Sequence, residues 1–166
     1  MMLLGHSFGA MVALQMAVRP PPMRLVGIDV SGVGTRYADA VLAKNPKTYV
    51  ADELATRSTR GREDAVDPTP LRISPLPQRE PYEALAWSSR VDAIAAAVTV
   101  PITITVGEHD RTWINSPEHL GALFVNAKSV ALKVQPHSGH NISLGSAART
   151  YHLQAIAFFD NCLIAQ

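Results

Sequence analysis

The 166-residue sequence has little of several things, beginning with cysteine, of which Cys162 is the single example. One cysteine cannot form an internal disulfide, so the fold does not depend on an oxidising compartment, and we predict a cytoplasmic protein. Charged residues make up only 17% of the chain, and the net charge is +1. Because the lysines and arginines are few and scattered, we expect neither a nucleic-acid partner nor a polybasic membrane surface.

Long apolar runs are also missing. No run reaches the roughly 20 residues that a membrane-spanning helix needs, so we expect no membrane span. The apolar start, residues 1–18, has no basic n-region and contains glycine, histidine and serine, so it does not read as a signal peptide. What the chain does contain is 47% hydrophobic residues, enough at this length for a globular domain with a sizeable core.

The hydrophobic pattern alternates between short β-branched runs and longer helical runs. Apolar strand patterns occupy residues 3–4, 24–30, 101–106 and 129–134, and helical patterns occupy residues 8–18, 91–97, 116–124 and 147–164. A strand, a helix and a second strand within the first thirty residues form a βαβ unit. We therefore predict an α/β fold with an open, mostly parallel sheet and flanking helices.

Residues 34–90 differ from the rest of the chain. They combine short amphipathic helical patterns at 36–44, 48–57 and 81–87 with a proline-rich, charged stretch. Long irregular segments within a compact domain usually form lids or binding loops. We interpret residues 1–166 as one domain and residues 34–90 as a cap or lid excursion over the strand ends.

One motif at the start of the chain carries chemistry. Gly5-His6-Ser7-Phe8-Gly9 lies between a strand pattern and a helix pattern, which is the arrangement of a nucleophile elbow. A sharp strand-to-helix turn presents the serine hydroxyl from a strained backbone, and the two glycines leave room for the turn and for the helix over the strand. The same five-residue pattern also occurs by chance, so its meaning depends on the other strand ends.

Two further polar residues follow later strands. Asp110 comes after the strand at 101–106, and His140 comes after the strand at 129–134. Carboxyl ends of parallel strands meet at one edge of a sheet, so Ser7, Asp110 and His140 can meet there. A histidine can take the proton of a serine hydroxyl, and a carboxylate can orient the imidazole. The chain order serine, aspartate, histidine is the order found in α/β-hydrolases.

These motifs, together with Pro101–Asp110 and Ser138-Gly139-His140, resemble the α/β-hydrolase superfamily over nearly the whole chain. The resemblance implies a catalytic triad in which Ser7 is the nucleophile, Asp110 the acid and His140 the base. It also implies that the backbone N–H of Phe8 is one oxyanion donor. No metal and no cofactor are implied. The expected function is a serine hydrolase or esterase that acts on a small-molecule ester, thioester or related acyl substrate.

Each assignment has alternatives in the sequence. Glu108 and Asp29 compete with Asp110 as the acid, and His137 competes with His140 as the base. We interpret His6 and His109 as residues that fill the motif and make structural hydrogen bonds, not as catalysts. Two aromatic residues, Trp113 and Phe124, line either a substrate pocket or the plain core.

The sequence departs from the family at its start. The resemblance places several strands and a second oxyanion donor before the elbow, whereas Ser7 is the seventh residue of this sequence. We therefore expect the C-terminal portion of an α/β-hydrolase fold, lacking its N-terminal part. The explanations are a truncated reading frame, a fragment completed by another chain or by self-association through the open sheet edge, and a degenerate homologue.

The alternative function is a non-catalytic binding or interaction module that docks through this open edge. A metal-dependent hydrolase is a third option, which the histidine spacing disfavours because no His-x-x-x-His pattern lies on a helix.

Overall fold

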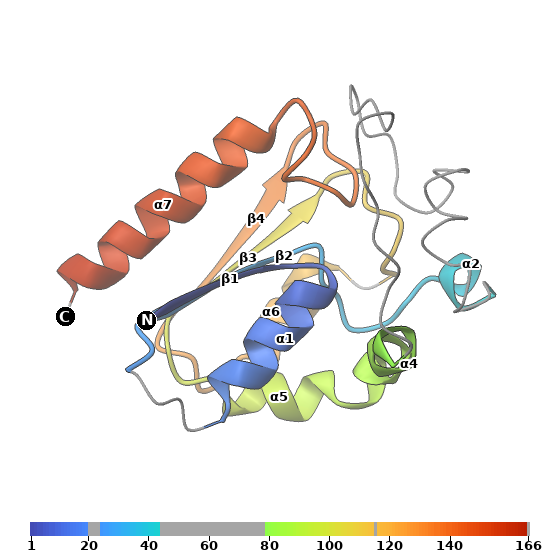
Figure 1. Cartoon of the computed structure of the whole chain (residues 1–166), viewed down its shortest axis with the longest axis horizontal. Coiled ribbons are helices and arrows are strands. Elements are labelled where there is room, and N and C mark those ends of the chain that lie inside the picture. Colours follow the sequence, from blue (N-terminus) through green and yellow to red (C-terminus); the bar gives the residue numbers. More distant parts are fainter. Residues whose placement is uncertain (20–23, 44–78, 115, 166) are drawn as a thin grey trace.

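The computed structural model describes residues 1–19, 24–43, 79–114 and 116–165. Its centre is a sheet of four strands in the order β1-β2-β3-β4, all parallel to their neighbours (Figure 1). The strands are β1 (Met2–His6), β2 (Gly27–Ser31), β3 (Ile102–Gly107) and β4 (Val130–Gln135). This confirms the predicted open, parallel α/β sheet.

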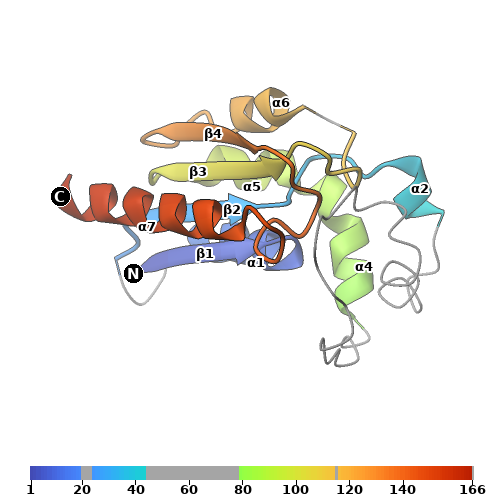
Figure 2. The same ribbon diagram turned by 90° about the horizontal axis from the view of Figure 1, so that it is seen from above.

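Helices cover both faces of the sheet. The described helices are α1 (Phe8–Ala17), α2 (Asp39–Leu42), α4 (Glu80–Leu85), the 3₁₀ helix η1 (Ala86–Ser89), α5 (Val91–Ala97), α6 (Pro117–Ala122) and α7 (Ala148–Ile164). Figures 1 and 2 show α1, α5 and α6 on one face and α7 on the other. Within the described residues, no helix is long and apolar enough to cross a bilayer.

The core lies between the central strands and their helices. Ile28, Val30 and Ile104 are fully buried, as expected for strands covered on both faces. The helix α1 contributes Ala10 and Leu14 to this core, and both are fully buried.

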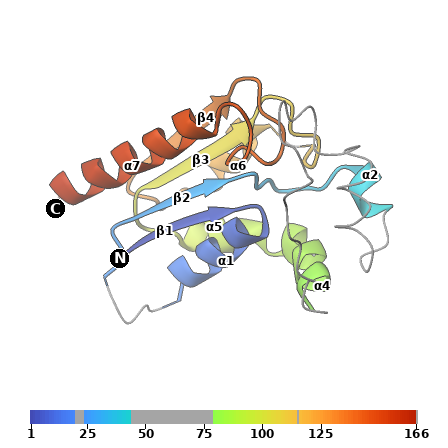
Figure 3. The ribbon, with the colours of Figure 1, turned by 45° about the horizontal axis from the view of Figure 1, so that its top comes forward.

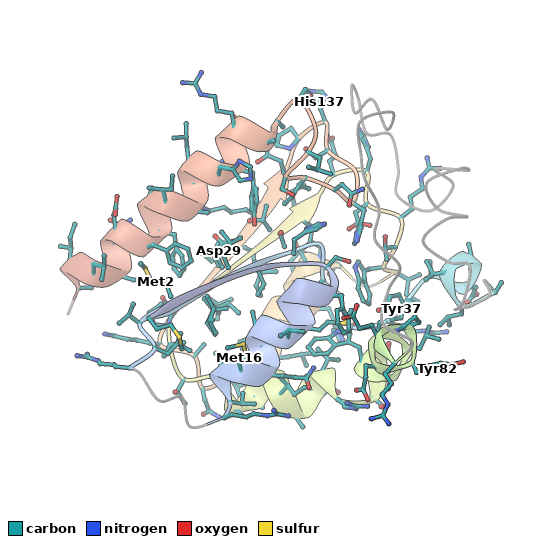
Figure 4. The ribbon with its side chains drawn as sticks, in the orientation of Figure 1. Met2, Met16, Asp29, Tyr37, Tyr82 and His137 are labelled. Atoms are coloured by element: carbon teal, nitrogen blue, oxygen red, sulfur yellow. The ribbon has the colours of Figure 1, made fainter. Side chains whose placement is uncertain are left out.

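The helix α1 is buried on one side and exposed on the other, although its sequence is apolar nearly throughout. Val12 and Met16 are 40% and 46% exposed, because α1 packs on the sheet through the side that carries its buried residues. Figure 4 shows Met16 on α1. An apolar sequence alone does not tell which side of a helix meets a neighbour.

Element boundaries moved by a few residues. The strand predicted at 24–30 begins at Gly27, because pairing with β1 starts there while the Val26 N–H bonds the Met1 carbonyl. The helix predicted at 36–44 shortens to α2. The helix predicted at 81–87 starts at Glu80 and tightens into η1. Residues 44–78 of the predicted cap, including the helix predicted at 48–57, lie outside the described residues.

The strands run in one direction, so their C-terminal ends form one edge, with α2 and α4 beyond it (Figure 3). Polar residues that follow β1, β3 and β4 therefore meet at this edge.

Candidate active site

Ser7 sits on the turn between β1 and α1, and its backbone is strained. Its φ of 54° and ψ of −119° lie outside the regions that non-glycine residues normally occupy. The turn is held from both sides. The Ser7 N–H donates to the Ser31 carbonyl at 2.8 Å, and the Ser7 carbonyl accepts the Ala10 N–H at 3.0 Å as the helix begins. The predicted strained strand-to-helix turn is confirmed.

The two glycines of the motif differ in what surrounds them. A Cβ on Gly5 would collide with the Gly9 carbonyl and lie 2.8 Å from the Cα of Ala10, so β1 and α1 touch there. A Cβ on Gly9 would meet nothing within 4 Å among the described residues. The expectation that both glycines make room therefore holds for Gly5 and is wrong for Gly9.

This difference predicts opposite effects for one substitution. Gly5→Ala should lower the free energy of unfolding by about 1–3 kcal/mol or more, because backbone atoms must move apart. Gly9→Ala should raise it by about 0.5–1 kcal/mol, because alanine is less flexible in a helix. Urea denaturation of the two variants beside the unmodified protein measures both values. Equal losses in the two variants would contradict the steric explanation.

Ser7, Asp110 and His140 are joined by two hydrogen bonds. His140 Nε2 lies 2.8 Å from Ser7 Oγ, and His140 Nδ1 lies 2.9 Å from Asp110 Oδ2. The other Asp110 oxygen accepts the Thr112 N–H at 2.8 Å. The side chains of Asp110 and His140 are each only 5% exposed. Three residues far apart in sequence thus form one line at the edge of the sheet.

The charge state of Asp110 suits this geometry. Burial acts to raise the pKa of its carboxyl, but the contact with His140 and the Thr112 N–H outweigh burial, so the pKa lies below its usual value. An ionised carboxylate only accepts hydrogen bonds, so it selects the His140 tautomer with hydrogen on Nδ1. That tautomer leaves the Nε2 lone pair facing the Ser7 hydroxyl.

The competing acid and base candidates have other partners. Glu108 is exposed and its carboxylate accepts the backbone N–H of His137 at 2.8 Å, a bond that lowers the pKa of the Glu108 carboxyl. His137 is also exposed and has a positive φ of 56°. The structure therefore brings Asp110 and His140 to Ser7, and it pairs Glu108 with His137 instead.

Phe8 is the first residue of α1. Its N–H is among the four that an α-helix leaves without an intrahelical acceptor, which suits the predicted oxyanion donor. The role of Phe8 stays a prediction.

The third acid candidate, Asp29, belongs to a buried chain of polar side chains below the site. The Tyr151 hydroxyl lies 3.4 Å from Asp29 Oδ1 and 3.0 Å from Ser31 Oγ, which in turn lies 3.0 Å from His6 Nδ1. The rings of His6 and His140 lie 5.1 Å apart. Figure 4 shows Asp29 between the sheet and α7.

This row of hydrogen-bonded side chains gives His6 a structural hydrogen bond, through Ser31, as expected from the sequence. Sequence reasoning missed the connection to Tyr151, which arises from the packing of α7 on β2.

Burial raises the pKa of Asp29 to about 6, against opposing effects of Lys133 and the Tyr151 hydroxyl. Since the folded state binds this proton more tightly than the unfolded state, stability falls as pH rises from about 4 to about 6. Asp29→Asn keeps an acceptor for Tyr151 and cannot ionise. The variant should gain about 1–3 kcal/mol over the unmodified protein between pH 4 and pH 7, measured by denaturation at each pH. A difference that is constant across this range would contradict the assignment.

The two aromatic candidates, Phe124 and Trp113, lie in different surroundings. Phe124 is buried in the core, 3% exposed. Trp113 stacks on Tyr37 with ring centroids 4.1 Å apart, and its indole N–H donates to the Gly32 carbonyl at 3.0 Å. Trp113 also lines a cavity of about 250 Å³ that has Asp110 in its wall. Trp113 is therefore the aromatic residue beside the candidate acid.

A parallel sheet with a strained serine between a strand and a helix defines an α/β protein with a nucleophile elbow. Over residues 2–152 the sequence matches the alpha/beta hydrolase family. The chain belongs to this family. No curated protein matches it significantly in sequence.

Solved structures with the same fold are distant in sequence. A Paleococcus ferrophilus monoacylglycerol lipase has a TM-score of 0.66 at 18% identity, with 97% of this chain and 68% of that chain covered. An E-2-(acetamidomethylene)succinate hydrolase has a TM-score of 0.65 at 18% identity, with 96% of this chain and 66% of that chain covered. A soluble variant of monoglyceride lipase from Saccharomyces cerevisiae has a TM-score of 0.64 at 17% identity, with 96% of this chain and 61% of that chain covered. The chain thus spans between 61% and 68% of the length of these three proteins. At these identities the likeness shows the fold alone.

Proposed function

We propose that the protein is a serine hydrolase that cleaves an ester, thioester or related acyl substrate through an acyl-enzyme. The observation that carries this proposal is the pair of hydrogen bonds, 2.8 Å and 2.9 Å long, that links Ser7 through His140 to Asp110. The order of the three residues, the strained elbow and the membership of the α/β-hydrolase family support it.

In the first half of the reaction, Ser7 Oγ forms a bond to the acyl carbon while its proton passes to His140 Nε2. The carbonyl oxygen becomes an oxyanion, to which the Phe8 N–H at the start of α1 donates. His140 then gives the proton to the leaving oxygen or sulfur as the bond to it breaks. Asp110 stabilises the protonated imidazole throughout and keeps its own negative charge.

In the second half, water replaces the leaving group. His140 Nε2 takes a proton from the water as its oxygen bonds to the acyl carbon. Collapse of the second tetrahedral intermediate returns that proton to Ser7 Oγ and releases the carboxylic acid. Residues 34–90, proposed as the cap, are the part of the chain expected to set substrate choice.

Two of the three similar structures are lipases of monoacylglycerol or monoglyceride. Their names favour a carboxylic ester as the first substrate to test, although the low identity supports the fold and no particular acyl chain. The serine nucleophile is common to esterases, thioesterases and lactonases, so the proposal is limited to the acyl class.

A fluorophosphonate probe tests the proposal directly, because it reacts with a serine whose hydroxyl is activated by a neighbouring base. The expected result is one covalent adduct per chain, located at Ser7 by peptide mass spectrometry. Heat-unfolded protein is the control and should not be labelled. An adduct elsewhere, or no adduct on the folded protein, would refute the mechanism.

A non-catalytic binding module is the second candidate, and one observation favours it. In the described part of the chain, β1 lies at the edge of the sheet, and Leu4 on it is 53% exposed. An exposed strand edge is a template for pairing with another chain. Size-exclusion chromatography with light scattering separates the candidates: a monodisperse dimer without probe labelling supports the module, and a labelled protein supports the hydrolase.

A further inference from the structure

Three exposed side chains gather on the rim beside the candidate active site. Glu108, His109 and His137 each offer one ligand atom, and these atoms lie within 4.8 Å of one another. Glu108 Oε2 lies 3.7 Å from His109 Nε2, and both side chains are more than 40% exposed. Figure 4 shows His137 at the outer end of the loop that follows β4. None of the three belongs to the hydrogen-bonded line from Ser7 to Asp110.

Their donor atoms, two imidazole nitrogens and a carboxylate oxygen, suit a borderline transition-metal ion. Two imidazoles and one carboxylate form a donor set that Zn²⁺ accepts in proteins, with a fourth position open to water. Bonds of about 2.0–2.2 Å put the ligand atoms of a tetrahedral zinc site roughly 3.3 Å apart. The ligand atoms of the three side chains all lie within 4.8 Å of one another, and Glu108 Oε2 and His109 Nε2 are already 3.7 Å apart. Rotation of the exposed side chains can close the remaining gap to zinc-ligand spacing.

The carboxylate is already held by an outer hydrogen bond. The backbone N–H of His137 donates to Glu108 Oε2 at 2.8 Å. A carboxylate has two oxygens with several lone pairs, so this bond leaves room for a metal. Metal-binding carboxylates are commonly fixed by such hydrogen bonds, which orient the ligand. Here the bond comes from the residue that supplies another ligand.

The backbones that carry the three side chains are locked together. The Glu108 N–H donates to the Gln135 carbonyl at 3.0 Å, and the His109 N–H donates to the Ser138 carbonyl at 2.9 Å. A Cβ on Gly107 would collide with the Gly139 carbonyl, so the two loops approach as closely as backbones can. Assembling the metal site therefore requires side-chain rotation and no loop rearrangement.

We propose that Glu108, His109 and His137 bind a divalent transition-metal ion of the zinc class at a site separate from Ser7. Glu108 and His109 directly precede Asp110, and His137 lies three residues before His140. A bound ion joins the loop that carries the candidate acid to the loop that carries the candidate base. Mg²⁺ and Ca²⁺ prefer all-oxygen sites and should not bind here.

Isothermal titration of metal-free protein with zinc chloride tests the site. The expected result is one Zn²⁺ per chain and a higher melting temperature with Zn²⁺, with no effect of Mg²⁺. His137→Asn suits the positive φ at that position, which asparagine tolerates. His137→Asn and His109→Asn should each weaken Zn²⁺ binding by more than the roughly 10- to 100-fold that loss of an outer hydrogen bond costs.

His152→Asn is the matched control, because His152 is an exposed histidine on α7 and should leave Zn²⁺ affinity unchanged. Melting temperatures without metal show whether the variants fold. The visible spectrum of bound Co²⁺ gives a second readout, and its tetrahedral bands should disappear in His137→Asn. Unchanged Zn²⁺ affinity in both rim variants, or an equal loss in His152→Asn, would overturn the proposal.

Discussion

Ser7→Ala is expected to lower kcat for acyl-ester hydrolysis by about 10⁶-fold, the size of effect seen when a serine nucleophile is removed from a triad. The substitution removes the atom that forms the acyl-enzyme, and His140 then has no hydroxyl to activate. It should leave the fold intact, because the elbow is held by the Ser7 backbone bonds to Ser31 and Ala10, which alanine keeps. Kinetics with p-nitrophenyl esters of increasing chain length measure the loss.

A matched serine makes the measurement specific. Ser89 lies on η1, where its hydroxyl bonds the Ala86 carbonyl, and Ser89→Ala should retain full hydrolysis and full probe labelling. If Ser7→Ala hydrolyses the esters as fast as the unmodified protein, the hydrolytic activity does not arise from the proposed nucleophile. Residual turnover above the uncatalysed rate is expected, because oxyanion stabilisation and substrate binding remain.

The meeting of Ser7, Asp110 and His140 could be predicted because it follows from topology. Each residue comes directly after a strand, and the C-terminal ends of parallel strands share one edge of the sheet. The sequence could not choose between Glu108 and Asp110 by this rule, since both follow β3. The structure separates them, because the Thr112 N–H and His140 hold the Asp110 carboxylate inward.

Features that depend on long-range packing could not be predicted in this way. The buried hydrogen bonds that connect Asp29 to His6 pass through Tyr151, more than 120 residues from Asp29 in sequence. They form only because α7, which carries Tyr151, packs against β2. The rim cluster was missed for another reason. Glu108 and His137 belong to different loops, whereas a sequence motif for a metal site depends on regular spacing within one element.

Asp110→Asn is the second large effect expected, with a loss of about 10⁴-fold in kcat. Asparagine can present an amide N–H to His140 Nδ1, which favours the tautomer with hydrogen on Nε2. That hydrogen then faces Ser7 Oγ where a lone pair is needed, so the serine is not activated. The unfolding free energy should change much less than kcat does, because the Thr112 N–H can still bond the side-chain oxygen.

Asp160→Asn is the control for this variant, since Asp160 is an exposed aspartate on α7 far along the chain and should retain full kcat. Raising the pH should restore part of the Asp110→Asn activity, because hydroxide then replaces the missing general base in removing the serine proton. Loss of labelling at Ser7 should follow the loss of kcat in the same variant. If Asp110→Asn keeps its activity while Glu108→Gln loses it, the acid role belongs to Glu108, and the hydrogen bond between Asp110 and His140 is structural only.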